Sequence, residues 1–181
     1  MSRGGVVGGG CDTAAMATWR QFEEESPDLA AAVQARFRSA KSHVLATLRQ
    51  DGSPRVSGTE VDFNGPDMTI GSMLGAVKAR DLRRDGRFAI HAATNDDEAL
   101  EGGDAKVAGY AVEVVGDAEL TAAAQAAGQT DPFHAFRLDL TEVVLTSLAP
   151  GGQALLIQTW RPGEPVLRYE RRNDDPVPRR L

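Results

Sequence analysis

The 181-residue sequence contains a single cysteine, Cys11, and this scarcity excludes several kinds of site. One cysteine cannot form an intramolecular disulfide, and it cannot build a cage of thiolates around a metal ion. The three histidines, His43, His91 and His134, are scattered without the spacing of metal ligands, so we expect no metal site. The near absence of cysteine fits a reducing compartment, and we expect a cytoplasmic location.

Long apolar runs and an excess of basic residues are also missing from this chain. No run approaches the roughly 20 apolar residues that a membrane-spanning helix needs, so we expect no membrane partner. The formal net charge of -6 argues against a general binder of nucleic acid or of anionic membranes. Any basic binding site must therefore be local.

The length and a hydrophobic content of 41% predict one globular domain with a substantial core. A glycine-rich leader at residues 1–16 and a charged, proline-containing tail at residues 173–181 are typical of disordered segments. We therefore expect the folded domain over residues 17–172. No internal repeat or interior linker divides it.

The stretch from His43 to Val61 is typical of two strands joined by a tight turn. Val44, Ala46 and Leu48 alternate along the first strand, Asp51-Gly52 supplies the turn, and Pro54 begins the second strand. Further strands are predicted over residues 68–72, 88–92, 106–118, 136–145 and 154–160, and helices over residues 27–38, 76–84 and 120–127. Gly109 and Gly116 predict bends in the long strand that contains them.

The second strand of the hairpin carries a polar stripe. Alternation places Arg55, Ser57 and Thr59 on one face and Val56, Gly58 and Glu60 on the other. Two interpretations are open: the polar face is exposed to water, which is the default for a sheet, or it faces a ligand. Gly58 inside the strand is compatible with a bulge or with a closely approaching ligand.

Lys78 lies in the first turn of the helix predicted over residues 76–84, where a positive charge is unfavourable unless an anion binds the free N–H groups. A phosphate there would meet these N–H groups, the Lys78 ammonium, the Ser72 hydroxyl and the Arg55 guanidinium. The alternative is an ordinary surface lysine. The polar strand face, the small Gly71 and Ser72, and the glycine before the helix favour an anion site.

Two segments carry a resemblance to a known family: ATLRQDGSPRV at residues 46–56 and KARDLRRDGRFAIH at residues 78–91. They resemble the pyridoxamine 5'-phosphate oxidase-like superfamily of flavin-binding split barrels, over about residues 25–170. The resemblance implies a mainly β fold, a six-stranded antiparallel split barrel with flanking helices. It also implies a homodimer with two cofactors at the subunit interface.

In that family the arginine of the second strand and the basic residue of the helix after the third strand hold the cofactor phosphate. These positions are Arg55 and Lys78 in this sequence. Main-chain and small-residue contacts to the cofactor are implied for Val56, Ser57, Gly71, Ser72 and Val77. Trp160, near the end of the last clear strand, is either a core residue or stacks on the cofactor ring. No residue stands out as a catalytic acid or base.

The chain departs from the oxidase itself at Glu60. On the second strand the oxidase resembles Arg-x-Val-Leu-Leu-Lys, and this chain has Glu60 at the position of that lysine, five residues after Arg55. A carboxylate there repels a phosphate, whereas a lysine would bind it. The oxidase's Ser-Arg-Lys at the helix entry is Ala76-Val77-Lys78 here. We therefore expect an FMN-dependent oxidoreductase that acts on a small organic substrate by hydride transfer, with vitamin B6 oxidation disfavoured. An F420-dependent reductase and a non-enzymatic flavin or haem binding protein are the alternatives.

Overall fold

Strands dominate the computed structural model, which describes residues 15–94, 100, 102–128 and 132–181. The helices are α1 (Trp19–Glu25), α2 (Pro27–Arg38), α3 (Val77–Arg84) and α4 (Asp117–Ala127). The strands are β1 (His43–Leu48), β2 (Pro54–Thr59), β3 (Asp62–Asn64), β4 (Asp67–Met73), β5 (Arg87–His91), β6 (Asp104–Glu113), β7 (Phe133–Leu148), β8 (Leu155–Trp160), β9 (Leu167–Arg171) and β10 (Arg179–Arg180).

Six strands form an antiparallel barrel in the order β2-β1-β5-β6-β7-β4. Within the described residues no ladder joins β2 to β4, so the barrel is split between these two strands. This arrangement confirms the mainly β fold and the predicted six-stranded split barrel. The strand β3 pairs with β4, and β8, β9 and β10 continue the sheet beyond β7.

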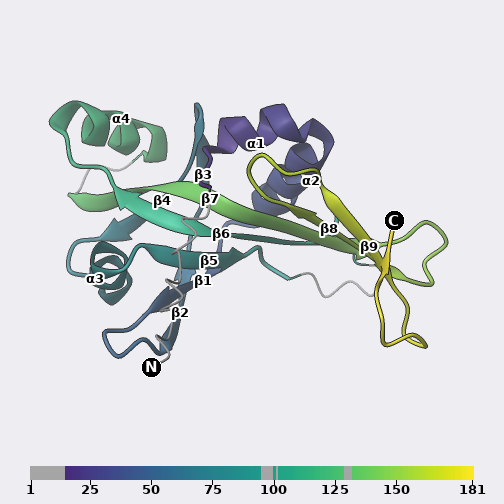
Figure 1. The fold of residues 1–181 in the computed structure, drawn as a ribbon. Coiled ribbons are helices and arrows are strands. Elements are labelled where there is room, and N and C mark those ends of the chain that lie inside the picture. Colours follow the sequence, from purple (N-terminus) through teal and green to yellow (C-terminus); the bar gives the residue numbers. More distant parts are fainter. Residues whose placement is uncertain (1–14, 95–99, 101, 129–131) are drawn as a thin grey trace, which may run out of the picture.

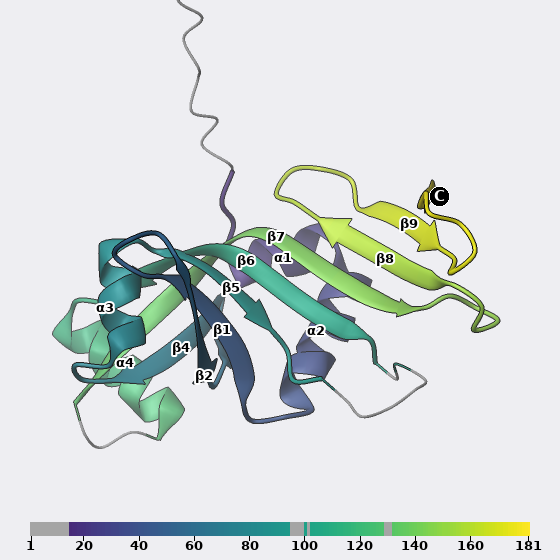
Figure 2. The same ribbon diagram turned by 90° about the horizontal axis from the view of Figure 1, so that it is seen from below.

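The long strand β7 connects the barrel to this extension. Its first part, residues 133–138, pairs with β4, and its last part, residues 143–148, pairs with β8. Figures 1 and 2 show α3 and α4 toward one end of the molecule and β8 and β9 toward the other, with α1 and α2 together against the middle of the sheet. The split and α3 therefore lie away from the extension.

Local sequence signals explain the first elements. The helix α2 has the predicted bounds and begins with Pro27 in its first turn. The N-cap residue of α2, Ser26, makes no capping hydrogen bond with its side chain; it also ends α1, where its backbone N–H donates to the Phe22 carbonyl. In the β1–β2 turn, Asp51 Oδ1 accepts from the Ser53 N–H at 2.9 Å, and Gly52 has a φ of 82°.

The core lies between the barrel and the α1–α2 pair. Trp19, Phe22 and Trp160 are at most 1% exposed, and the rings of Phe22 and Trp160 lie 4.6 Å apart between centroids. The Trp160 Nε1 donates to Glu25 Oε2 at 3.0 Å, which satisfies its buried polar atom. Trp160 is thus a core residue and does not stack on a cofactor within this chain.

The two ends of the chain differ in what the structure describes. Most of the leader predicted at residues 1–16 lies outside the described residues, as does Cys11, and Ala17 bridges to Leu140 at the start of the fold. The tail expected to be disordered instead contains β10, which pairs with β9, because its backbone groups reach an unpaired strand edge. No helix among the described residues is long and apolar enough to cross a membrane.

His43 is a buried structural residue. It is 3% exposed, its ring packs edge-on against Phe37 at 4.9 Å between centroids, and its Nδ1 accepts from the Ala93 N–H at 3.2 Å. Burial lowers the pKa of His43, and the charge of nearby Arg36 lowers it further. Both effects favour the neutral ring in the folded protein.

This burial predicts a loss of stability in mild acid. Because the folded pKa of His43 lies below its unfolded value of 6.5, the unfolded chain binds more protons between these two values, and the free energy of unfolding falls as pH drops below about 6.5. Thermal unfolding between about pH 7 and pH 5.5 measures this slope. In His43→Phe, which keeps a ring but cannot take a proton, the slope should flatten; an unchanged slope would assign it to other groups.

Candidate functional site

A pocket of about 540 Å³ lies across the split of the barrel. It is bordered by β2 and β4, by the segment that leads into α3 and by the start of β7. Its lining residues are Ser42, Gly58, Thr59, Glu60, Asp62, Gly71, Ser72, Met73, Ala76, Lys78, Pro132 and Phe133. The volume falls in the ordinary range of small-molecule and cofactor sites.

Lys78 is held at the mouth of this pocket by the opposite strand. Its Nζ donates to the Gly58 carbonyl of β2 at 2.8 Å, so the side chain bridges the gap between α3 and the strand. Partial burial lowers the pKa of Lys78, whereas the charge of Glu60 acts in the opposite direction. The ammonium is thus fixed in position and retains donor capacity for an anion.

The first turn of α3 offers further donors. Its N-cap residue, Ala76, has no side chain that could accept a hydrogen bond from the free N–H groups, and no acidic residue lies in this turn. Lys78 occupies the same turn, so no side chain within it neutralises the positive end of the helix dipole. An anion is the natural complement of this end of α3.

Ser72 contributes an unsatisfied polar atom. It is 6% exposed, it lines the pocket, and its Oγ has no hydrogen-bond partner among the described residues. A buried hydroxyl without a partner costs free energy, and a ligand is one way to satisfy it. Gly71, beside it on β4, also lines the pocket. The predicted trio of Gly71, Ser72 and Lys78 therefore borders one pocket.

Arg55 lies beside this pocket without lining it. Its Nε donates to Asp81 Oδ2 of α3 at 2.6 Å, and its side chain borders a second, shallower hollow with Arg49, Gln50 and Asp51. Lys78 and Asp81 are three residues apart on α3 and share a helix face. Arg55 thus contacts α3 about one turn after Lys78, whose own side chain extends from α3 to Gly58 of β2.

The polar stripe of β2 faces inward, so the default interpretation of an exposed face is wrong. Thr59 is 3% exposed, whereas Val56, on the other face, is 69% exposed. The reason is the position of α3, which covers the polar face and supplies Asp81 to Arg55. Ser57 lies opposite Leu45 of β1, and Val77 is 41% exposed at the start of α3. Val56, Ser57 and Val77 do not line the 540 Å³ pocket.

One edge of the pocket is acidic. Glu60 pairs with Lys41 at 3.4 Å near the surface, and Asp62 of β3 is half-buried beside it. Burial raises the pKa of Asp62, and the charge of Glu60 raises it further. The sequence identified Glu60 but not Asp62, Met73 and Phe133. Met73 directly follows the predicted Ser72 on β4, whereas Phe133 reaches the split only because β7 pairs with β4.

The other histidines and acidic residues form no metal centre. His134 Nδ1 lies 2.7 Å from Glu113 Oε1, and Arg83 Nε lies 2.8 Å from Glu113 Oε2, so this cluster connects β7, β6 and α3. His91 Nδ1 lies 2.6 Å from the carbonyl of Ala92. Across the part of the chain that the structure describes, no group of three His, Cys, Asp or Glu side chains could hold a metal ion.

Solved structures with the same fold include three informative ones. A pyridoxamine 5'-phosphate oxidase-related, FMN-binding protein from Nostoc punctiforme has a TM-score of 0.57 and 12% identity, with 80% of this chain and 95% of that chain covered. PhzG from Burkholderia lata, in complex with tetrahydrophenazine-1-carboxylic acid, has a TM-score of 0.51 and 19% identity over 88% and 91%. HutZ, the heme storage protein from Vibrio cholerae, has a TM-score of 0.51 and 23% identity over 67% and 94%.

Comparison with curated proteins finds no match. Comparison with family models matches residues 29–147, which is more than half of the chain, to pyridoxamine 5'-phosphate oxidase. The matched region runs from α2 to the end of β7 and contains the split, the pocket and both segments of the resemblance. The chain belongs to the pyridoxamine 5'-phosphate oxidase family.

Proposed function

We propose that this protein is an FMN-dependent oxidoreductase that transfers a hydride to or from a small organic substrate. One observation carries the proposal: the uncapped, basic end of α3 opens onto the pocket at the split. Lys78, the free N–H groups of the first turn and the unpartnered Ser72 hydroxyl together suit a phosphate. Membership of the family and the FMN-binding relative support this choice of phosphate ligand.

The residues present fit the phosphate end of FMN. Lys78 would supply a charge-assisted hydrogen bond, Ser72 a neutral one, and Gly71 close approach of the backbone. Val56, Ser57 and Val77 lie outside the lining of this pocket, so we assign them no contact with the phosphate. FMN, when bound, supplies hydride chemistry through its ring system. The protein's own residues would hold the phosphate and line the pocket at the split.

The acidic edge of the pocket bears on the substrate. Glu60 and Asp62 lie where a second phosphate would be repelled, since two carboxylates border this side of the pocket. This arrangement disfavours a phosphorylated vitamin B6 substrate and favours a small acceptor without a phosphate group. We also propose a cytoplasmic location, which the near absence of cysteine favours.

Identification of the co-purifying cofactor tests the proposal. The protein as purified should absorb near 450 nm, and the released ligand should have the mass of FMN. A shorter-wavelength band would indicate F420, and a sharp band near 400 nm would indicate haem. Haem iron takes a His, Cys, Met or Tyr ligand, and Met73 alone among the residues assigned to the pocket could serve. A colourless protein that binds none of the three would overturn the proposal.

We further propose that the protein is a homodimer. The outer faces of β2, β1, β5 and β6 carry a row of small and apolar residues in register, Val56, Ala46, Ala89 and Ala108. Val44 and Val112 on the same strands are 46% and 43% exposed, and Val56 is 69% exposed. A contiguous apolar face of this kind is typical of a subunit interface, and a second copy of the same face would cover it.

Replacement of Val44 by aspartate tests this interface. A charge within the proposed contact should convert the dimer to a monomer in light scattering after gel filtration, because the buried carboxylate would lack a partner. Val177→Asp is the matched control, since Val177 is 68% exposed in the tail, far along the chain from these strands. A monomeric wild-type protein, or a dimer that survives Val44→Asp, would rule out this face as the interface.

A further inference from the structure

Asp81 is a buried carboxylate that gathers contacts from three elements. It is 3% exposed on α3 and accepts from Thr47 Oγ1 of β1 at 3.1 Å. Arg55 Nε of β2 donates to its Oδ2 at 2.6 Å, and Arg84 Nη2 donates to its Oδ1 at 3.0 Å. Both oxygens of the carboxylate are therefore in use.

The electrostatics of this cluster keep Asp81 ionised. Burial pushes the pKa of Asp81 upward, but the hydrogen bonds from Arg55, Arg84 and Thr47 outweigh burial, and the pKa lies below its ordinary value. A buried ion pair is weak evidence for added stability, because desolvation offsets the attraction between the charges. Its more robust effect is orientation, since the fixed carboxylate restricts the long arginine side chain to one geometry.

The attachment of Arg55 is one-sided. Asp81 contacts its Nε, and the two terminal guanidinium nitrogens make no other hydrogen bond among the described residues. The Arg55 side chain as a whole remains 23% exposed, so the protein does not enclose it fully. Because Asp81 lies one turn after Lys78 on α3, the guanidinium is held beside this helix at the turn that follows the end that suits an anion.

We infer that Asp81 is a positioning residue: it holds Arg55 so that the guanidinium reaches the phosphate bound by Lys78 and the first turn of α3. The inference rests on the proposed function, since FMN supplies the phosphate. It assigns Asp81 no contact with the cofactor. Asp81 affects FMN binding only through Arg55. A purely structural role of Asp81 would not depend on Arg55.

Binding of FMN and of riboflavin, which lacks the phosphate, tests the inference in Asp81→Asn. The substitution keeps the shape of the side chain and removes the charge that orients Arg55. We expect FMN affinity to fall about tenfold, while riboflavin affinity and the fold remain unchanged. In Arg55→Ala, which also weakens FMN binding, adding Asp81→Asn should cause no further loss, because the residue through which Asp81 acts is gone.

Asp85→Asn is the matched control. Asp85 follows α3 and pairs with Arg87 at 2.6 Å, so the variant loses one carboxylate and one arginine pair but leaves the bond between Arg55 and Asp81 in place. Should Asp81→Asn fail to fold, Thr47→Val removes one hydrogen bond to the same carboxylate, and a smaller loss confined to FMN is expected.

Equal losses for both flavins, no loss for either, or additive losses in the double variant would overturn the inference alone. A wild-type protein that binds neither flavin would overturn the proposed function as well.

Discussion

Replacing Gly109 with alanine is expected to destabilise the fold by about 3 kcal/mol. Gly109 lies on β6 at a register shift against β7, where an added Cβ would be 1.9 Å from the backbone carbonyl oxygen of Asp139. No side-chain rotation can relieve a clash with backbone, so the two longest strands would have to separate locally. Chemical denaturation of the purified variant measures the loss.

Gly58→Ala is the control for this effect. Gly58 is also a strand glycine, but an added Cβ there would meet only Ser42 Oγ at 3.7 Å, an ordinary contact. We expect a change within about 0.5 kcal/mol for that variant. Equal stabilities of the two variants would show that the register shift between β6 and β7 can absorb a side chain.

Replacing Lys78 with alanine is expected to weaken FMN binding by about 1 to 3 kcal/mol, the range for a hydrogen bond to a charged group. The variant loses the ammonium at the mouth of the pocket and its bond to Gly58. Riboflavin binding should change little, because the phosphate is the part of FMN that Lys78 is proposed to hold. Fluorescence titration with both flavins measures the difference.

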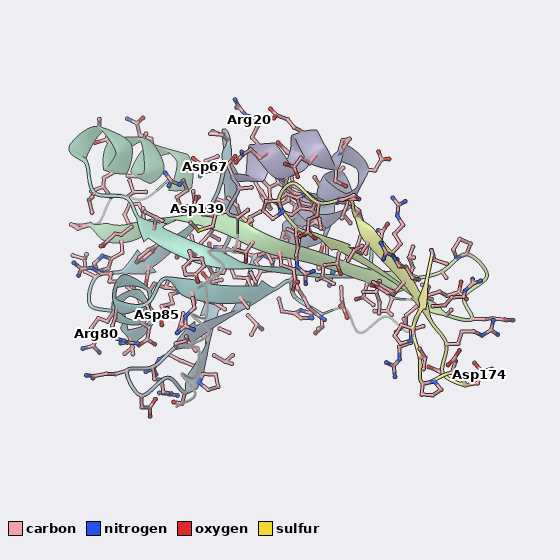
Figure 3. All side chains as sticks on the ribbon, viewed as in Figure 1. Arg20, Asp67, Arg80, Asp85, Asp139 and Asp174 are labelled. Atoms are coloured by element: carbon pink, nitrogen blue, oxygen red, sulfur yellow. The ribbon has the colours of Figure 1, made fainter. Side chains whose placement is uncertain are left out.

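Arg80→Ala provides a matched cation on the same helix. Arg80 is exposed and projects from the side of α3 away from the barrel (Figure 3), so its loss should leave FMN affinity unchanged. An unchanged FMN affinity in Lys78→Ala would reject the assignment of the phosphate site to α3. A loss of similar size in both variants would instead indicate a general effect of net charge.

Several elements were predictable because their signals are local. The β1–β2 hairpin, α2 and α3 lie within a residue or two of their predicted bounds, since alternation, a turn and a first-turn proline act over short stretches. Gly109 lies at the predicted irregularity of β6. Gly116 does not bend this strand, because β6 ends at Glu113 and Gly116 is the N-cap of α4.

Other features depend on contacts that no local pattern encodes. The strands β3 and β10, of three and two residues, are too short for a periodic signal. Together with β9 they are defined by pairing with neighbouring strands. The acidic residue Asp81 reads as part of a solvated helix face, yet its hydrogen bonds join it to Arg55 and Thr47, which are 26 and 34 positions away. The only local sign of this role in the sequence is that Asp81 stands three residues, about one helical turn, after Lys78.

The sequence by itself determined the class of fold, the hairpin, the helix that carries Lys78 and the small residues of β4, because each follows from periodicity, turn chemistry or the family pattern. Only the tertiary structure decided which face of β2 is covered. Closure of the barrel brings β4 opposite β2 and places α3 over the polar face, so Gly71, Ser72 and Lys78 border one pocket while Arg55 pairs with Asp81. Burial and long-range pairing, which depend on every strand at once, set that outcome.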